Sequence, residues 1–431
     1  MSGGLVGLPG PARAAGVNAV QSPDLRGRSV WVHVLGCRSN LCEGDFLAGD
    51  LEARGALVTR DPKGCSAAVI VSCSVTAEAD RKCRQAVRRA RRTVGETGVV
   101  AVCGCWAQGA VADEARELGA DILVGNRRKG ELTDALEAMV RDGRAFRDLR
   151  SDLFRDRRWE ELPATRPVFH TRAFLKVQEG CDHFCSYCVI PFLRGRSVSR
   201  PADRAVDEAR RLLDAGCREI VLTGIHLGMY GRDMGSSLAE LVRALSALPG
   251  LERLRLGSLE PFALSDDLLE ALGESPVFCP HLHLPLQSGD DGVLSRMRRG
   301  YTADDFARVC ARARGRLGAD LHISSDILVG FPGEDEGAFG NTLRLMRRAG
   351  IGRAHVFPYS PRRGTPAASF EGRVSPAALS DRAAEAAALG NELLDAYAGR
   401  FVGRTLPVLA EGGRCSGYTP HFLPAVWKGG A

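Results

Sequence analysis

The chain has 431 residues, of which 45% are hydrophobic, so it is long enough to form two or three domains with buried cores. Its 58 basic and 52 acidic residues leave a formal charge of +6, which is compatible with a nucleic-acid partner but does not require one. No apolar run approaches the roughly 18 residues that cross a bilayer, and residues 1–28 lack the basic start and apolar centre of a signal peptide. We therefore expect a cytoplasmic protein without a membrane partner.

Residues 29–126 alternate apolar runs with helical patterns, which predicts repeated βα units and a parallel sheet. Cys37, Cys73 and Cys105 each lie at or just past the carboxyl end of a predicted strand. Because those ends share one edge of a parallel sheet, where open α/β sheets bind ligands, the three thiols are expected to meet in space. The other cysteines lack that placement and are interpreted as small buried hydrophobes: Cys42, Cys65, Cys83, Cys103, Cys217, Cys279, Cys310 and Cys415.

The densest basic run covers residues 81–92. It can be the solvated face of a helix or a surface that contacts phosphate, and the sequence leaves both interpretations open.

Residues 127–165 contain a helical pattern and then a polar stretch, rich in Arg and Asp, which is typical of a linker. Beyond it, strand-like apolar runs begin at residues 172, 218, 253, 281, 321 and 353. Amphipathic helices separate most of them, so the pattern predicts an incomplete (βα)6 barrel with its chemistry at the carboxyl ends of the strands. A helix over 376–398 and two short strand-like runs are expected to follow.

The first barrel strand runs into "EGCDHFCSYCVIPFLRG" (179–195), which holds Cys181, Cys185 and Cys188. A closed zinc site needs four ligands, and His183 is poorly placed between two cysteines to be the fourth. Three cysteines on a four-iron cluster instead leave one iron open for a substrate or cofactor. The loop therefore favours an iron–sulfur centre, with zinc as the alternative.

The loop, with Tyr187 before its last cysteine, resembles the signature of the radical S-adenosylmethionine (SAM) enzymes. With "LGCRSN" (35–40), "VSCSVTAEADRKCRQAVRR" (71–89) and "CGCWAQ" (103–108), the chain is similar to the radical SAM methylthiotransferases over residues 29 to about 418.

That resemblance implies two 4Fe-4S clusters, one held by Cys181, Cys185 and Cys188 and the second by Cys37, Cys73 and Cys105. It also implies SAM as both radical source and methyl donor, with Tyr187 and Gly224 as cofactor-binding residues. A radical from SAM would remove hydrogen from adenine C2, where sulfur carried by the second cluster is inserted. The implied partners are the tRNA anticodon loop, an electron donor such as flavodoxin or ferredoxin, and a sulfur donor.

Two further motifs, "LTGIHLGMYG" (222–231) and "PYSPRRGTPAA" (358–368), are most similar to the branch acting on N6-threonylcarbamoyladenosine next to the anticodon of tRNA. The alternatives are isopentenyl-type adenosine in tRNA, an aspartate of a ribosomal protein and, remotely, a non-catalytic zinc-containing RNA-binding protein. A single-stranded loop base can be splayed into the barrel mouth without breaking a pair. The candidate contacts there are Thr223, Gly224, His226, Glu260, Gln287, Ser288 and Asp326, and candidate phosphate contacts are Arg298, Arg299, Arg362 and Arg363.

The expected α/β architecture has a flavodoxin-like parallel-sheet domain, a partial (βα)6 radical SAM barrel and a short, truncated β segment that resembles part of a TRAM domain. The expected boundaries are 1–28 for a flexible extension, 29–145 for the first domain with the second cluster, 146–166 for the linker, 167–400 for the barrel and 401–431 for the truncated segment. Because such a segment has exposed strand edges, we expect Tyr418, Phe422 and Trp427 to pack it onto the body of the chain.

Overall fold

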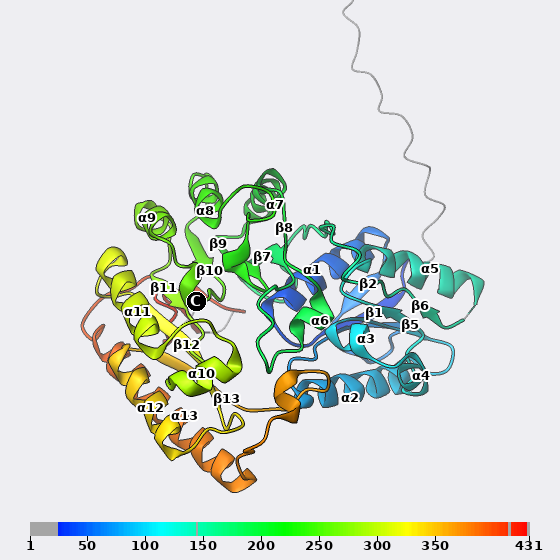
Figure 1. Cartoon of the computed structure of the whole chain (residues 1–431). Coiled ribbons are helices and arrows are strands. Elements are labelled where there is room, and N and C mark those ends of the chain that lie inside the picture. The colour runs from blue at the N-terminus through cyan, green and yellow to red at the C-terminus, as the bar shows by residue number, and fades with distance from the viewer. Residues whose placement is uncertain (1–24, 144, 413–414, 429–431) are drawn as a thin grey trace, which may run out of the picture.

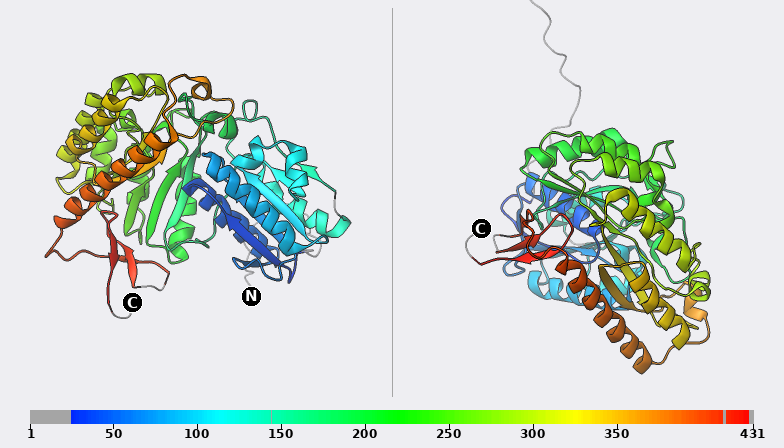
Figure 2. Two further views of the ribbon diagram at one scale, coloured as in Figure 1. Left: turned by 90° about the horizontal axis from the view of Figure 1, so that it is seen from below. Right: turned by 90° about the vertical axis from the view of Figure 1, so that its left-hand side faces the viewer.

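The computed structural model describes residues 25–143, 145–412 and 415–428, so most of the extension expected over 1–28 lies outside the described residues. The N-terminal sheet domain and the half barrel lie side by side (Figures 1 and 2). Among the helices of the described ranges, none is long and apolar enough to cross a membrane.

The N-terminal domain is built on a parallel sheet of six strands in the order β2-β1-β3-β4-β5-β6. The strands are β1 (Ser29–Val34), β2 (Leu57–Thr59), β3 (Ala67–Ser72), β4 (Val99–Gly104), β5 (Ile122–Val124) and β6 (Arg147–Asp148). The helices are α1 (Arg38–Ala53), α2 (Ala77–Val94), α3 (Cys105–Gly109), α4 (Ala112–Glu117), the 3-10 turn η1 (Lys129–Glu131) and α5 (Leu132–Asp142). The order 2-1-3-4-5 is that of flavodoxin-like folds and confirms the predicted class. One difference is β6, which lies within the stretch expected as a linker and pairs with β5.

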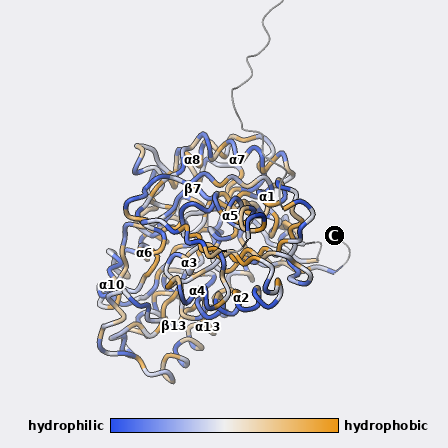
Figure 3. The backbone as a smooth tube through the Cα atoms, turned by 90° about the vertical axis from the view of Figure 1, so that its right-hand side faces the viewer, coloured by the Kyte–Doolittle hydropathy of each residue, from blue (hydrophilic) through white to orange (hydrophobic). Residues whose placement is uncertain are grey.

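Two apolar layers hold this sheet. The central strands β3 and β4 are buried along their whole length, as continuous apolar strands covered on both faces must be. Helices α1 and α5 pack on one face, and α2 and α4 pack on the other. Helix α2 contains many hydrophilic residues (Figure 3), and its Arg88 and Arg92 are exposed.

The second half contains the six parallel strands that the sequence predicts for a partial barrel. They are β7 (Ala173–Glu179), β9 (Glu219–Gly224), β10 (Arg253–Leu256), β11 (His281–His283), β12 (His322–Val329) and β13 (Arg353–Pro358), and a short β8 (Val198–Ser199) runs antiparallel to β7. The helical elements are α6 (Ile190–Arg194), α7 (Ala202–Asp214), η2 (Leu227–Met229), α8 (Leu238–Ser246), η3 (Pro261–Ala263), α9 (Asp266–Glu274), α10 (Asp291–Met297), α11 (Ala303–Leu317), α12 (Glu336–Arg348), η4 (Pro366–Ser369) and α13 (Pro376–Gly399). Isolated bridges join β10 to the β11 segment, and the larger helices cover the outside of the strands (Figure 1).

Helix α1 belongs to both halves. Its residues Leu47 and Leu51 pack under the N-terminal sheet, whereas Cys42 packs on Phe174 and Val221 of the barrel. The Cys42 thiol also donates to the Phe174 carbonyl oxygen at 3.1 Å. The N-terminal domain therefore covers part of the inner face of β7 and β9.

The C-terminal segment forms an antiparallel sheet of three short strands, β14 (Leu409–Ala410), β15 (Ser416–Tyr418) and β16 (Pro424–Val426), where two strand-like runs were expected. It lies against the amino ends of the barrel strands, because Arg255 of β10 stacks on the Phe422 ring at 4.8 Å and donates to the Pro420 carbonyl at 3.0 Å. Tyr418 stacks on Phe422 at 4.7 Å, so these two residues pack as expected. Trp427 is half-buried and bonds through its amide to Cys415 within the segment.

Candidate active site

The loop that carries Cys181, Cys185 and Cys188 turns away sharply from the carboxyl end of β7. Gly180 makes the turn at φ 74°, and a Cβ there would lie 2.0 Å from the Arg196 carbonyl oxygen, so only glycine fits. The Cys188 amide then donates to the Cys185 carbonyl at 3.0 Å. Backbone geometry thus holds the three thiols on one short turn.

A buried arginine contacts this loop, although the sequence analysis proposed it as a contact for phosphate. Arg299 is 2% exposed, donates to the Cys185 sulfur at 3.3 Å and forms an ion pair with Glu260. Burial raises the pKa of the Cys181 thiol to about 12 and also raises that of Cys188, so both are protonated at neutral pH and would lose their protons on binding a metal. Three sulfurs beside a cationic N–H donor are a donor set that fits an iron–sulfur group.

The strand-end cysteines lie together at the carboxyl edge of the N-terminal sheet. Cys37 and Cys73 flank the switch point between β1 and β3, which is where flavodoxin-like sheets bind ligands. A Cβ on Gly36 would lie 2.8 Å from the Cys73 sulfur, and burial followed by the nearby Cys105 thiol raises the pKa of Cys73 to about 12. Cys73 and Cys105 are buried, whereas Cys37 is exposed.

Two hydrogen-bond donors that the sequence analysis did not identify contact the sulfur of Cys105. Arg194 donates from Nε to Cys105 at 3.1 Å, and Asn126 donates from Nδ2 at 3.5 Å. N–H groups that donate to the sulfurs also surround iron–sulfur clusters, so this second donor set fits the expected group as well. The only sequence hint was that Arg194 follows the cysteine loop closely.

Within the described ranges, no three His, Cys, Asp or Glu side chains converge closely enough to hold a single metal ion. The thiolates of a four-iron cluster bind different irons and need not converge in that way.

Tyr187 and Gly224 lie on the barrel side of the cysteine loop. The Tyr187 ring makes an edge contact with Phe331, with the ring centroids 6.4 Å apart. A Cβ on Gly224 would lie 2.9 Å from Oε1 of Gln178, the same oxygen that accepts the amide of His226 at 2.7 Å. Close packing thus explains the glycine, and the contact of either residue with SAM stays a prediction.

Several candidate substrate contacts are already held by the protein. Thr223 is 2% exposed, and the buried Ser288 hydroxyl bonds with Thr342 at 3.4 Å. Glu260 is committed to Arg299. These residues shape the barrel mouth from within rather than projecting into it.

His226 is different, because it belongs to an aromatic group at the mouth. Its ring lies 5.9 Å from Phe262 and 6.4 Å from His183, and Phe262 is 43% exposed. The Nδ1 atom of His226 and the Nε2 atom of His183 are buried without a hydrogen-bond partner among the described residues. Gln287, at φ 69°, takes a left-handed turn.

Polar side chains line the inner face of the barrel on β11, β12 and β13. The Ser324 hydroxyl bonds with His281 at 2.8 Å and with His283 at 2.9 Å. Nε2 of His283 lies 3.2 Å from the Asp326 carboxylate, and the His355 ring lies 5.7 Å from the His283 ring. This wall offers hydrogen-bonding partners rather than an apolar lining.

Arg38, the residue after Cys37, extends toward this wall. It is half-buried, and burial followed by the charges of Arg172 and Arg255 lowers its pKa to about 10, while Asp326 opposes the shift. Among the described residues, the Arg38 guanidinium has no hydrogen bond or ion pair, although the charge of Asp326 attracts it. A cation is thus placed between one cysteine site and the polar wall.

The candidate phosphate contacts divide into two classes. Arg299 is 2% exposed and paired with Glu260, so it presents no surface to phosphate, whereas the half-buried Arg362 pairs with Asp80 of α2 at 2.5 Å and its contact with phosphate stays a prediction. Arg298 and Arg363 are exposed and stay candidates.

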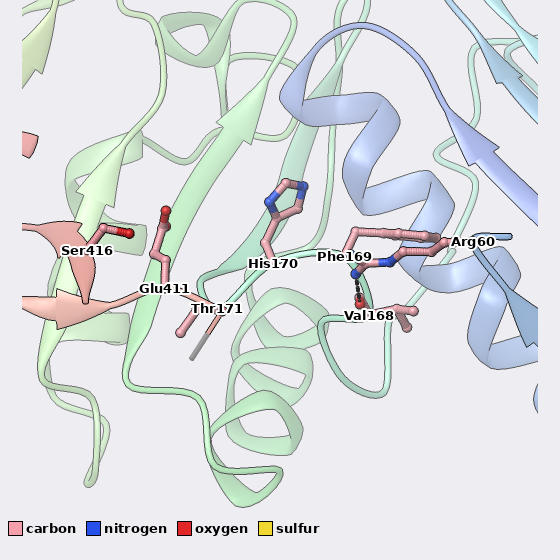
Figure 4. Close-up of a pocket in the computed structure, with 8 residues that line it drawn as sticks. Arg60, Val168, Phe169, His170, Thr171, Glu411 and Ser416 are labelled. Atoms are coloured by element: carbon pink, nitrogen blue, oxygen red, sulfur yellow. Dashed lines mark hydrogen bonds between the residues drawn. The ribbon is translucent and has the colours of Figure 1, made fainter. Parts of the chain in front are cut away.

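A cavity of about 500 Å³ lies away from both cysteine groups, between Arg60, the segment 168–171 and the C-terminal sheet (Figure 4). Arg60 donates to the Val168 carbonyl, and Glu411 and Ser416 enter from the other side. It borders the amino end of β7, opposite the end that carries Cys181, and we assign it no part in the chemistry.

Two family models match the chain. "Radical SAM superfamily" covers residues 175–346, and "Uncharacterized protein family UPF0004" covers residues 29–125. By structure, the chain is similar to the radical SAM methyltransferase TsrM from Kitasatospora setae, with a TM-score of 0.58, 15% identity, and 79% of this chain and 74% of the other covered. At that identity the likeness shows the fold alone.

Curated relatives are similar over nearly the whole chain. The threonylcarbamoyladenosine tRNA methylthiotransferase of Bacillus subtilis is 36% identical over 93% of this chain and 90% of its own length. Its counterpart from Thermotoga maritima is 35% identical over 93% and 92%. The tRNA-2-methylthio-N(6)-dimethylallyladenosine synthase of Jannaschia sp. is 37% identical over 89% and 84%, so overall identity does not separate the two kinds of relative.

Proposed function

The chain belongs to the radical SAM methylthiotransferases, and we propose that it converts N6-threonylcarbamoyladenosine next to the anticodon of tRNA to its 2-methylthio derivative. Family membership makes it a transferase of tRNA that uses SAM and a 4Fe-4S cluster. The proposal adds the second cluster, the use of SAM as methyl donor as well as radical source, and the identity of the nucleoside.

The observation that carries the proposal is a contact, across the boundary between the halves, between the strand-end group and the helix that follows the cysteine loop. Arg194 follows Cys188 by six residues in the sequence, and its Nε atom lies 3.1 Å from the sulfur of Cys105. The strand-end group thus contacts the segment that directly follows the loop group, which supports a reaction that needs both a radical source and a sulfur source.

When bound, SAM and the clusters supply a radical able to break an unactivated C–H bond and the sulfur that replaces the hydrogen. The chain's own residues position these groups and shield them from water. Arg299 and Gly180 fix the cysteine loop. Cys37, the exposed member of the strand-end group, leaves that site open on the side from which a base can approach.

The polar inner wall supports the threonylcarbamoyl substrate over the isopentenyl one. A threonylcarbamoyl group carries a carboxylate, a hydroxyl and N–H groups, whereas an isopentenyl group is apolar. We assign the carboxylate to Arg38, and the hydroxyl or an N–H group to Asp326, which lies 3.2 Å from His283. An isopentenyl group would leave the Arg38 guanidinium without a partner, which is how hydrogen-bonding sites reject apolar analogues.

The test uses two anticodon-loop RNAs that differ only in the modified adenosine. The anaerobically reconstituted enzyme is given SAM, a sulfide source and a reductant, and the nucleosides are analysed by mass spectrometry. We expect kcat/KM for the threonylcarbamoyl RNA to exceed that for the isopentenyl RNA by about 100-fold or more. The reverse preference would move the chain to the sister branch, and modification of neither RNA would favour the ribosomal-protein branch.

The proposal includes the division into 29–145, 146–166, 167–400 and 401–431 as domain, linker, barrel and terminal segment. It also includes a flavodoxin or ferredoxin as electron donor and a separate sulfur donor.

A further inference from the structure

Arg194 ends helix α6 and is fully buried between the two halves of the protein. Besides Cys105, its guanidinium donates to Asn40 at 2.6 Å, to Glu43 at 2.7 Å and to Glu179 at 3.0 Å. These partners come from α3, α1 and β7, so one side chain joins the strand-end group to both the shared helix and the first barrel strand.

The charges around Arg194 do not balance. Lys129 and Lys176 are buried beside it and share the same carboxylates, with Lys129 at 3.3 Å from Glu43 and Lys176 at 2.7 Å from Glu179. Glu179 accepts hydrogen bonds from Arg194 at 3.0 Å and from Lys176 at 2.7 Å, and Glu43 is shared by the same two cations. Three cations therefore face two carboxylates.

The edge of the network does not remove the excess. Arg127 lies within electrostatic range of Glu179, and Glu160 lies within range of Lys129. Together they add one positive and one negative charge, so the excess remains. A buried charge without a partner is costly, so an excess of one positive charge calls for an anion nearby. The Cys105 sulfur contacts Arg194 directly, and a cysteine that ligates a metal does so as the thiolate.

We propose that Arg194 is a positioning residue for the strand-end cluster, and that it couples this cluster to the loop site. It offsets the negative charge of a ligating Cys105 through a charge-assisted N–H···S bond, while Glu179 and the short helix α6 tie it to the end of the cysteine loop. The inference rests on the proposed function in one respect, namely that a cluster forms on Cys37, Cys73 and Cys105.

If Arg194 only clamped the two halves together, the reduction potential of the cluster would not depend on it. A clamp between the halves needs the contacts with Asn40, Glu43 and Glu179, but not the bond to sulfur. A cationic donor on a ligating sulfur stabilises the reduced, more negative cluster and raises its reduction potential. Loss of the donor should therefore lower that potential and weaken iron retention.

The experiment isolates the strand-end cluster in the full-length chain by changing the loop cysteines to alanine (Cys181→Ala, Cys185→Ala, Cys188→Ala). Arg194→Gln and Arg194→Lys are added separately to this background, and each protein is reconstituted anaerobically. The reduction potential is followed by electron paramagnetic resonance, and iron loss is followed with a chelator. Arg200→Gln is the matched control, because Arg200 is equally buried but forms its ion pairs with Glu161 and Glu208.

We expect Arg194→Gln to shift the potential downward and to speed iron loss at least threefold, with Arg200→Gln unchanged. Arg194→Lys keeps the charge but loses the planar fork, so its values should fall between those of the parent and Arg194→Gln; it also carries the test if Arg194→Gln does not fold. If Arg194→Gln had the same reduction potential and the same rate of iron loss as the parent, the inference would be wrong and the proposed function would be unaffected. A parent background that binds no iron would instead overturn the second cluster of the proposed function, and the inference with it.

Discussion

The two cysteine groups are built in opposite ways. The loop group comes from residues 181–188 alone, so its spacing can be read from the sequence. The turn at Gly180 sets the direction of the loop. The strand-end group exists only when β1, β3 and β4 pair in register. The loop group is balanced locally by the Arg299–Glu260 pair, whereas the strand-end group faces a network with excess positive charge. A local site should survive damage to the other domain, and a site assembled from distant strands should fail when its own strands lose their register.

The sharpest test of this contrast is removal of the loop group. Changing Cys181, Cys185 and Cys188 to alanine should remove about half of the bound iron and all reductive cleavage of SAM, because the strand-end group is independent of the loop sequence. Iron analysis and an assay for 5′-deoxyadenosine measure the two effects. An iron content equal to that of the parent would show that these cysteines hold no cluster.

Removal of the strand-end group should have the complementary effect. The variant with Cys37, Cys73 and Cys105 changed to alanine should still cleave SAM but form no methylthio nucleoside, because only the proposed sulfur-bearing site is lost. Both products are quantified in one reaction by mass spectrometry. Methylthiolation at the parental rate would leave the strand-end cysteines without a role.

A single methyl group should damage the strand-end site selectively. Gly36 has φ 103°, and a Cβ there would lie 2.5 Å from Cβ of Cys73, so Gly36→Ala should destabilise the domain by about 1–3 kcal/mol and lower iron content toward half. The matched control is Gly64→Ala, since Gly64 also has a positive φ but nothing within 4 Å. Denaturant unfolding and iron analysis report the outcome. Full iron retention in Gly36→Ala would contradict the register dependence of the site.

The residue next to Cys37 should affect substrate selection without affecting the clusters. Arg38→Gln should raise KM for threonylcarbamoyl RNA by about 10- to 100-fold, the usual loss for a hydrogen bond to a charged group. SAM cleavage without RNA and iron content should stay at parental values, as they should in the control Arg60→Gln on the far cavity. An unchanged KM would remove Arg38 from the substrate site.

The smallest expected effect concerns the basic helix α2, which lies outside both cysteine groups. Arg91 is fixed by Asp121 and by the Gly119 carbonyl, so it belongs to the fold, whereas Arg88 and Arg92 are exposed. If the latter contact phosphate, changing both to Gln should weaken tRNA binding and reduce the slope of log K against log salt by up to about 2. An unaltered slope would show that this face of α2 is solvated and does not contact phosphate.

The sequence predicted what depends on local pattern. Alternating apolar runs located all six barrel strands, and the strand ends placed Cys37, Cys73 and Cys105 at one sheet edge. The sequence did not show which arginines pair with a carboxylate far along the chain. Folding places such a carboxylate beside each of three arginines that look like surface residues in the sequence: Arg91, Arg299 and Arg362.

The same limit explains why Arg194 was missed. Its partners Asn40, Glu43 and Cys105 are distant in sequence, and no spacing rule connects them. The strand β6 was missed for a different reason, since two residues in a polar stretch carry no periodicity and gain their pairing only from the edge of β5.

The shared helix α1 sets a condition on turnover. Its Cys42 packs on Phe174 and Val221 of the barrel while Leu47 and Leu51 pack in the other core, so a hinge between the halves would expose apolar surface from both. It would also separate the buried pairs of Glu43 with Arg194 and Lys176. Entry of the tRNA substrate and release of the product must therefore proceed with the halves docked. We expect dissociation of the RNA, rather than domain opening, to set the pace of successive catalytic cycles.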